Sequence, residues 1–375
     1  MKRLILLFVA SLATLPLFAQ DMIVLRDGTI VQSKVLEISS SEIKYKKFSM
    51  TASAAYNKHH ASNYHGKGYA GSYIYNLVIW GSPQYDVREF RNYWVAGKEN
   101  EQQNWFEAAW YNNPYFAAYE IVDQLSYDYM NATFTANYEI TPWLKAVLRA
   151  GGDAKTKRDE WRNPMSAATG GWGKTGKYGV IREYTGSINA DAMLMADKRW
   201  GKFRTEALVG GNLYYYTYDY MSSETSGGLS MPGFYSLNAS IDPIKASSSL
   251  KRQQINSLYG KATLSWDDTY FVDVTGRNDW SSTMDPLHKS YFYPSVAGSV
   301  ILSEIIPMPQ CWDFLKARAS WTMTKLPAGI YEINNAYSIQ KDVWSGNKGA
   351  TYPSTLKGGS VLPETSQTLE VGLAT

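Results

Sequence analysis

The sequence predicts an all-β protein: an incomplete segment of a transmembrane antiparallel up-and-down β-barrel, preceded by a small N-terminal β-unit. Three observations predict this class. Long segments alternate between apolar and polar residues, and the connections between them alternate between short and long. The chain is also rich in aromatic residues, with 29 tyrosines and 13 tryptophans. Such side chains gather where a membrane meets water, because each has an apolar body and a polar tip.

Residues 1–20 are expected to be a secretory signal peptide. Lys2 and Arg3 precede an apolar core, and Ala19 is a small residue suited to the cleavage site. The core is too short to span a membrane as a helix, and no later stretch reaches eighteen apolar residues. We therefore expect export without a helical anchor, as an outer-membrane barrel requires. A periplasmic or secreted protein would have the same features.

Residues 21–48 read as three short strands, MIVL, TIVQSKVLEI and EIKYKKF, with little aromatic content. They predict a small β-unit, whose role the sequence does not indicate. After Phe48–Ser49 the composition changes, and long segments rich in Tyr, Asn and Gly follow. We place a domain boundary there, so that residues 49–375 form the partial barrel.

Nine strong strands are predicted beyond that boundary by the alternation of apolar and polar residues. The clearest is 129–140, in which Met130 and Phe134 fall on one face while Asn131 and Thr135 fall on the other. Two weaker candidates lie before residue 81. The nine strands are expected near 129–140, 143–151, 180–196, 202–220, 254–266, 269–277, 290–303, 314–324 and 366–374.

The predicted connections alternate in length along the chain. The short ones are Thr141-Pro142, 197–201, Asp267-Asp268 and 307–313, and the long ones are 152–179, 221–253, 278–289 and 325–365. In an up-and-down barrel every second connection lies on the same side. Outer-membrane barrels place short turns at the periplasm and long loops outside. The alternation therefore predicts that the four long connections are external.

The two faces of the predicted strands differ in polarity. Within 254–277 one face carries apolar residues and the other carries Lys261, Asp273 and Arg277. A Lys or Arg on the lipid face costs about 2–4 kcal/mol at the bilayer midplane. We therefore expect these three charges to face the lumen and the opposite face to meet lipid, the apolar residues there being Leu258, Ala262, Leu264, Trp266, Tyr270, Val272 and Val274.

Six stretches, in order, carry a family resemblance: Asn113-Pro114-Tyr115-Phe116, ITPWLKAVLRAGGD at 140–153, GRNDWSS at 276–282, YFYPSVAGSV at 291–300, FLKARASW at 314–321 and LPETSQTLEVGL at 362–373. Through them the chain, from about residue 50 onward, resembles the barrel of SusC/RagA-type TonB-dependent outer-membrane receptors of Bacteroidetes. The resemblance implies a receptor or transporter in the outer-membrane lipid that imports glycans or peptides. It further implies a SusD-like lipoprotein and the TonB complex as partners, with no cofactor and no enzymatic activity.

The chain also departs from that family. Nothing resembles the family's plug or its TonB-binding box, and Met323-Thr324-Lys325-Leu326 replaces a glycine-containing segment. Large transporters use 22 strands, whereas about nine to eleven strands leave unpaired edges that are costly in hydrocarbon. We therefore expect a fragment, ending where the family continues, that is not competent for transport alone. A soluble secreted carbohydrate-binding β-protein and a small passive pore remain as alternatives.

Aromatic residues of the predicted external loops are the candidate substrate-binding residues, because sugar rings stack on flat aromatic faces. They are Trp161 and Trp172 in one loop, Tyr235 in the next, Trp280 in the third and Trp344 in the fourth. Each ring could equally order its loop or join an aromatic girdle.

Other kinds of site are not indicated. His59, His60 and His65 lack the further ligands that a metal site needs. Gly173-Lys174-Thr175 lacks the preceding glycine of a phosphate loop. The single Cys311 excludes an internal disulfide, and no catalytic triad stands out. A net charge of +3 gives no reason to expect nucleic acid.

Overall fold

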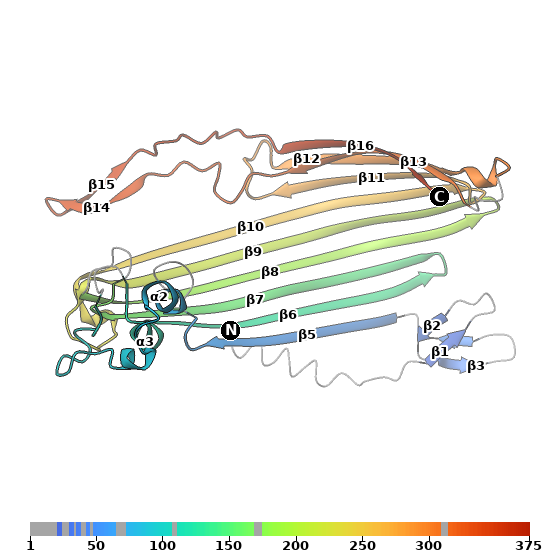
Figure 1. The fold of residues 1–375 in the computed structure, drawn as a ribbon. Coiled ribbons are helices and arrows are strands. Elements are labelled where there is room, and N and C mark those ends of the chain that lie inside the picture. Colours follow the sequence, from blue (N-terminus) through green and yellow to red (C-terminus); the bar gives the residue numbers. More distant parts are fainter. Residues whose placement is uncertain are drawn as a thin grey trace.

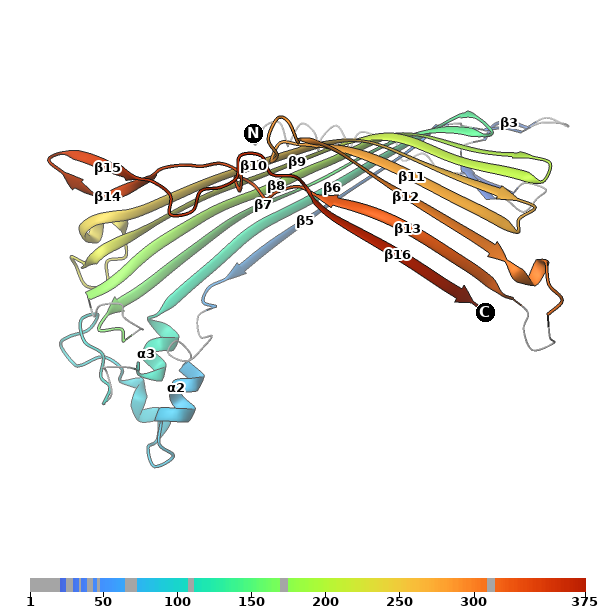
Figure 2. The same ribbon diagram turned by 90° about the horizontal axis from the view of Figure 1, so that it is seen from above.

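The computed structural model describes residues 21–24, 30–33, 35–38, 43–45, 48–64, 73–106, 111–168, 175–308 and 314–375. The predicted signal peptide lies outside these ranges. A single ten-stranded antiparallel sheet dominates, with strand order β16-β13-β12-β11-β10-β9-β8-β7-β6-β5. Figure 1 shows its long strands side by side, and Figure 2 shows that the sheet is curved. The predicted all-β fold class and up-and-down topology are confirmed.

The strands of this sheet follow each other in space almost in chain order. Only β16 is separated from its neighbour β13 by an intervening hairpin, which consists of β14 (Ser338–Trp344) and β15 (Asn347–Thr351). The sheet strands are β5 (Phe48–Ala61), β6 (Val122–Thr141), β7 (Leu144–Met165), β8 (Thr175–Trp200), β9 (Phe203–Leu229), β10 (Ser240–Trp266), β11 (Tyr270–Ser281), β12 (Ser290–Ile301), β13 (Lys316–Leu326) and β16 (Glu364–Ala374).

The alternation of short and long connections holds from β6 to β12, but the β12–β13 connection, predicted to be short, spans residues 302–315 and is longer than three of the connections predicted to be long. Two connections expected to be long loops are mostly strand. Strand β7 continues to Met165 and β8 starts at Thr175, so the predicted loop 152–179 is largely a ladder. Likewise β9 runs to Leu229 and β10 starts at Ser240, within the predicted loop 221–253. Both faces of these extensions carry polar residues, so the alternation that marks a half-buried strand is lost there while the backbone pairing continues.

The N-terminal segment forms four short strands rather than three. Strands β1 (Asp21–Val24) and β2 (Ile30–Ser33) form one antiparallel pair, and β3 (Val35–Ile38) and β4 (Ile43–Tyr45) form another. The predicted strand TIVQSKVLEI is thus divided between β2 and β3. Its standing as a separate unit stays a prediction.

Two short α-helices and a 3-10 turn lie between β5 and β6: α2 (Tyr73–Trp80), η1 (Val87–Arg91) and α3 (Pro114–Tyr119). In the region from Phe48 to residue 81, where two weak strand candidates were expected, the described residues form the strand β5 and the helix Tyr73–Trp80. Asn113 caps α3, because its side-chain oxygen accepts from the Tyr115 N–H at 2.9 Å. Within the parts of the chain that are described, no helix is long and apolar enough to cross a membrane.

A small core ties this helical segment to the end of β7. Phe116 and Ile121 are fully buried, and Ala167 packs in the same cluster. The Gln103 side chain donates to the Ser166 carbonyl at 2.5 Å and to the Asn112 side chain at 3.0 Å. Buried amides with complete partners fix the connection in one arrangement. The segment is therefore anchored at the sheet end that carries the long connections.

Candidate functional site

One face of the ten-stranded sheet is apolar and open. Leu258, Leu264 and Val272, expected on one face, lie there with exposed fractions of 56%, 51% and 46%. They are not enclosed between two layers, as a soluble sandwich would require. The strand registers place further exposed residues on this apolar face, among them Met50, Leu148, Ile188, Leu194, Val209, Leu213, Val274, Val296, Leu369 and Val371.

Aromatic side chains border the apolar face at both ends. Near the short connections they are Tyr138, Trp200, Phe203, Trp266 and Tyr270; near the long connections they are Tyr56, Tyr184, Trp280 and Phe292. On β11, Tyr270 and Trp280 mark the two borders, ten residues apart. At about 3.3 Å per residue and a tilt of about 40°, that spacing gives a band about 25 Å high. On β11 this equals the height of the apolar band of outer-membrane barrels, whereas on β8 the border residues Tyr184 and Trp200 lie farther apart, at sixteen residues.

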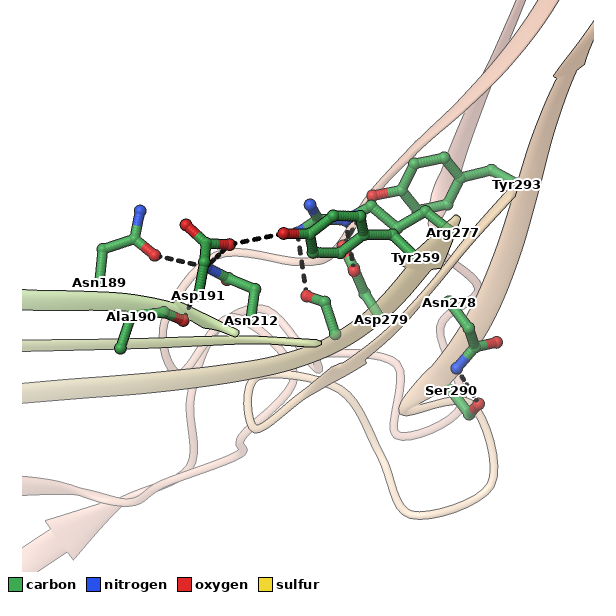
Figure 3. Close-up of polar contacts among 11 residues, drawn as sticks. Asn189, Ala190, Asp191, Asn212, Tyr259, Arg277, Asn278, Asp279, Ser290 and Tyr293 are labelled. Carbon is green, nitrogen blue, oxygen red and sulfur yellow. Dashed lines mark hydrogen bonds and ion pairs between the residues drawn. The ribbon is translucent and has the colours of Figure 1, made fainter. Parts of the chain in front are cut away.

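The opposite, polar face carries a hydrogen-bond network centred on Asp191 (Figure 3). The Tyr259 hydroxyl donates to Asp191 Oδ1 at 2.9 Å, and the Asn212 amide donates to the same oxygen at 3.0 Å. Arg149 Nη2 lies 3.4 Å from Asp191 Oδ2. These contacts join β7, β8, β9 and β10 through side chains as well as through the backbone.

The network continues across β10, β11 and β12. Arg277 donates from Nε to Asp279 Oδ1 at 2.7 Å and from Nη2 to the Ser257 hydroxyl at 2.9 Å. The Tyr293 hydroxyl donates to Asp279 Oδ2 at 2.8 Å (Figure 3). The Arg277 guanidinium also lies 5.6 Å from the centre of the Tyr259 ring. Tyr259, Arg277 and Tyr293 contribute to a hollow of about 280 Å³ on this part of the sheet.

Lys261, Asp273 and Arg277 lie on the face opposite the apolar one, as predicted. Lys261 Nζ lies 3.6 Å from Asp273 Oδ1, and both residues share the face of Arg277 in the register of β10 with β11. The sheet therefore separates an apolar surface from a polar one across the same strands. This arrangement suits a wall between hydrocarbon and water.

A row of four tyrosines follows β9 on the polar face, namely Tyr214, Tyr216, Tyr218 and Tyr220. The rings of Tyr218 and Tyr220 stack with centres 6.3 Å apart, and Lys251 Nζ lies 5.7 Å from the Tyr218 ring. This row was not predicted, although the alternation in YYYTYDY at 214–220 indicates it. It is an aromatic surface on the side expected to meet water.

Trp161 and Trp280 do not lie in loops, contrary to the prediction. Trp161 is in β7 on the polar face, opposite Gly179 of β8. Trp280 is in β11 and lies on the apolar face, in line with Val272 and Val274. The reason is the same for both, since the strands continue beyond the alternating segments from which their ends were predicted.

Of the other three candidate residues, no ring contact or hydrogen bond joins the two that the structure describes. Trp172 lies outside the described residues. Tyr235 is in the loop before η2 (Leu237–Ala239), where burial raises its pKa to about 12 and Arg162 lies 6.0 Å from its ring. Trp344 ends β14 and is 89% exposed. A binding role for any of the five stays a prediction.

The described residues contain no group of three or more side chains placed to hold a metal ion. His59 instead stacks on Tyr127, with ring centres 4.8 Å apart. His65 lies outside the described residues.

The contact between Trp161 and Gly179 gives a stability prediction. A Cβ added at Gly179 would lie 2.1 Å from Cζ2 of Trp161, so we expect Gly179→Ala to displace the ring and destabilise the sheet by about 1–3 kcal/mol. Urea unfolding in detergent measures this loss. Gly298→Ala is the control, because its nearest atom lies at 4.0 Å. Adding Trp161→Ala should recover part of the loss, and an unaffected Gly179→Ala variant would contradict the assignment.

Asp285, in the connection between β11 and β12, gives a pH prediction. A hydrogen bond with the His288 side chain, 2.8 Å from Oδ2, lowers the pKa of Asp285, and the Leu287 N–H assists. A lowered folded-state pKa means that the contribution to stability is present above the unfolded value of about 3.9 and is lost as pH falls below it. NMR titration of the carboxyl should show this. His288→Ala should raise the pKa of Asp285, and an unchanged value would refute the pairing.

No family model and no curated protein sequence matches the chain. Solved structures do match it. A chain of the RagAB peptide transporter is 16% identical to this chain, with a TM-score of 0.69. The match covers 88% of this chain and 36% of the transporter chain. Chains of the RagAB peptide importer in the closed-closed and open-open states are each 17% identical, with TM-scores of 0.65 and 0.64, and each match covers 87% of this chain and 36% of theirs.

The similarity establishes a shared fold. This chain spans 36% of the length of each of those structures. The ten-stranded sheet thus has the architecture of part of a transporter chain.

Proposed function

We propose that this chain forms part of the wall of an outer-membrane transport barrel of the SusC/RagA type of TonB-dependent receptor. The observation that carries the proposal is the sheet itself, with an apolar face between two aromatic borders and a connected polar network behind it. The fold shared with the RagAB structures supports the same conclusion. In this role the chain contributes to transport and not to catalysis.

The apolar face would lie against lipid, and the network from Arg149 to Tyr293 would line the lumen. Burying apolar area stabilises by about 25 cal/mol per Å², and a monomer seldom leaves so large an apolar surface in water. The long connections would then lie on the external side, and the short ones at the periplasm.

The sheet ends in two edge strands, β5 and β16. A complete transporter would need further strands to pair with them. Among the described residues no ladder joins β5 to β16, so both edges are unpaired in this sheet. Each unsatisfied backbone group in hydrocarbon costs several kcal/mol. We propose that a closed barrel, a plug, the TonB complex and a SusD-like lipoprotein are needed for active uptake, and that this chain alone does not perform it.

A peptide is the proposed ligand, with a glycan as the alternative. The structures of similar fold belong to a peptide transporter. The polar face offers carboxylates, guanidinium groups and amides in one network, a set that can pair with both the charged ends and the amides of a peptide. The tyrosine row of β9 could stack with side chains or with sugar rings.

Fractionation of cells that express the full chain tests the location. We expect the protein in the outer-membrane fraction, where it should require detergent for extraction and migrate differently on electrophoresis before and after heating. Recovery in the soluble periplasm without detergent would overturn the proposal and favour a secreted carbohydrate-binding protein. TonB-dependent uptake by this chain alone would overturn the statement on transport, and ion conductance without TonB would indicate a passive pore.

A further inference from the structure

Two arginines face each other just beyond the aromatic border at the long-connection end. Arg158 of β7 pairs in register with Arg182 of β8, and the strand alternation places both on the apolar face. Along β8 the same face carries Ile188, then Tyr184 of the border, then Arg182. The pair is thus one step outside the apolar band. This inference rests on the proposed function, because it needs that band to lie in a bilayer.

The local charge around this pair is positive. Arg158 and Arg162 both bind Glu160, with Nη2 atoms 2.7 Å from its two oxygens, and the Glu160 side chain is only 8% exposed. Arg182 is exposed and makes no ion pair with any residue that the structure describes. Two guanidinium groups therefore share one carboxylate, and the third, that of Arg182, has no carboxylate partner among the described residues. Like charges placed directly opposite on neighbouring strands are destabilising unless a counter-charge is present.

Other acidic residues on this face do not neutralise the positive charge of the three arginines. Asp128 pairs in register with Lys58 and accepts a hydrogen bond from the Tyr56 hydroxyl. Asp219 lies one diagonal step from Arg182 of β8 and from Arg252 of β10, and no ion pair joins it to either among the described residues. Neither acid forms an ion pair with Arg158, Arg162 or Arg182 in the described part of the chain. The three arginines Arg158, Arg162 and Arg182, together with Glu160, keep a net charge of +2.

We propose that these arginines bind the phosphorylated headgroup of a lipid in the leaflet at the long-connection end. The guanidinium groups would make charge-assisted hydrogen bonds to the phosphate oxygens. The acyl chains would lie along the apolar rows below Tyr184. Free phosphate lacks these apolar contacts and should bind much more weakly. Basic side chains next to a bilayer attract anionic lipid in the same way.

The test uses the full chain in detergent micelles, with phosphatidic acid as the probe and phosphatidylcholine as the neutral comparison. Native mass spectrometry measures bound lipid during titration. We expect R158Q/R182Q to weaken phosphatidic acid binding about tenfold. Arg182→Lys keeps the charge and should retain most of the affinity. Lys155→Gln is the matched control, because it removes one charge from the polar face of β7 and should change nothing.

Each outcome decides the inference. Equal affinity of R158Q/R182Q and wild type would overturn it, as would displacement of the lipid by inorganic phosphate at the same concentration, which indicates a free-anion site. The single variant Arg182→Gln keeps the ion pair between Arg158 and Glu160. Weaker lipid binding by this variant therefore does not come from a folding defect at Glu160. Heat-modifiable migration is measured on the same samples. A chain that enters membranes but shows no headgroup preference refutes the lipid site alone, whereas a chain that does not enter them refutes the proposed function too.

Discussion

Val296→Arg is expected to destabilise the protein in a bilayer by about 2–4 kcal/mol, because it places a charge on the apolar face. Val296 pairs with Val274 of β11 and Trp321 of β13, and its side chain is 45% exposed on that face. In water such a substitution on an exposed side chain changes stability by only about 0.5 kcal/mol. The size of the effect therefore reports whether this surface meets lipid.

The neighbouring residue supplies the matched control. Ala297 points to the polar face and pairs in register with Asp273. Ala297→Arg adds the same side chain next to a carboxylate, so we expect a loss below about 1 kcal/mol. Unfolding by urea, followed by tryptophan fluorescence in lipid vesicles, measures both variants. Equal losses for the two would show that the faces do not differ in environment.

The second large effect is expected for Asp279→Ala, with a loss of about 1–3 kcal/mol. The Asp279 side chain is 9% exposed and accepts from Arg277 at 2.7 Å and Tyr293 at 2.8 Å. Its removal leaves a guanidinium and a hydroxyl without their partner on the polar face. Asp279→Asn keeps an acceptor oxygen and should lose less.

Asp273→Ala on the same strand and face is the control for this effect. Its ion pair with Lys261 is longer, at 3.6 Å, and its side chain is 37% exposed. Exposed pairs contribute about 0–1 kcal/mol, so we expect a small loss. If Asp273→Ala costs as much as Asp279→Ala, the network around Arg277 does not stabilise the polar face beyond an ordinary surface pair. A double variant lacking Arg277 and Asp279 should lose less than the sum of the single variants.

The sequence by itself determined the sheet, its topology and the sidedness of its residues. A strand has a period of two, so alternation assigns each residue to a face without knowledge of its partners. That is why Leu264 and Asp273 were placed correctly on opposite faces. The order of the connections likewise showed which strand ends lie together, because adjacent antiparallel strands reverse direction at every turn.

Only the tertiary structure decided where the strands end and which polar side chains meet. Strand β7 extends to Met165 because its backbone pairs with β6 and β8, and that pairing needs no alternation in the side chains. Trp161 was therefore assigned to a loop. The contact of Tyr259 with Asp191 joins residues 68 positions apart across two strand boundaries, and it depends on registers that sequence patterns do not specify. The face of a residue is a local property of the chain, whereas its neighbours on that face are set by long-range pairing.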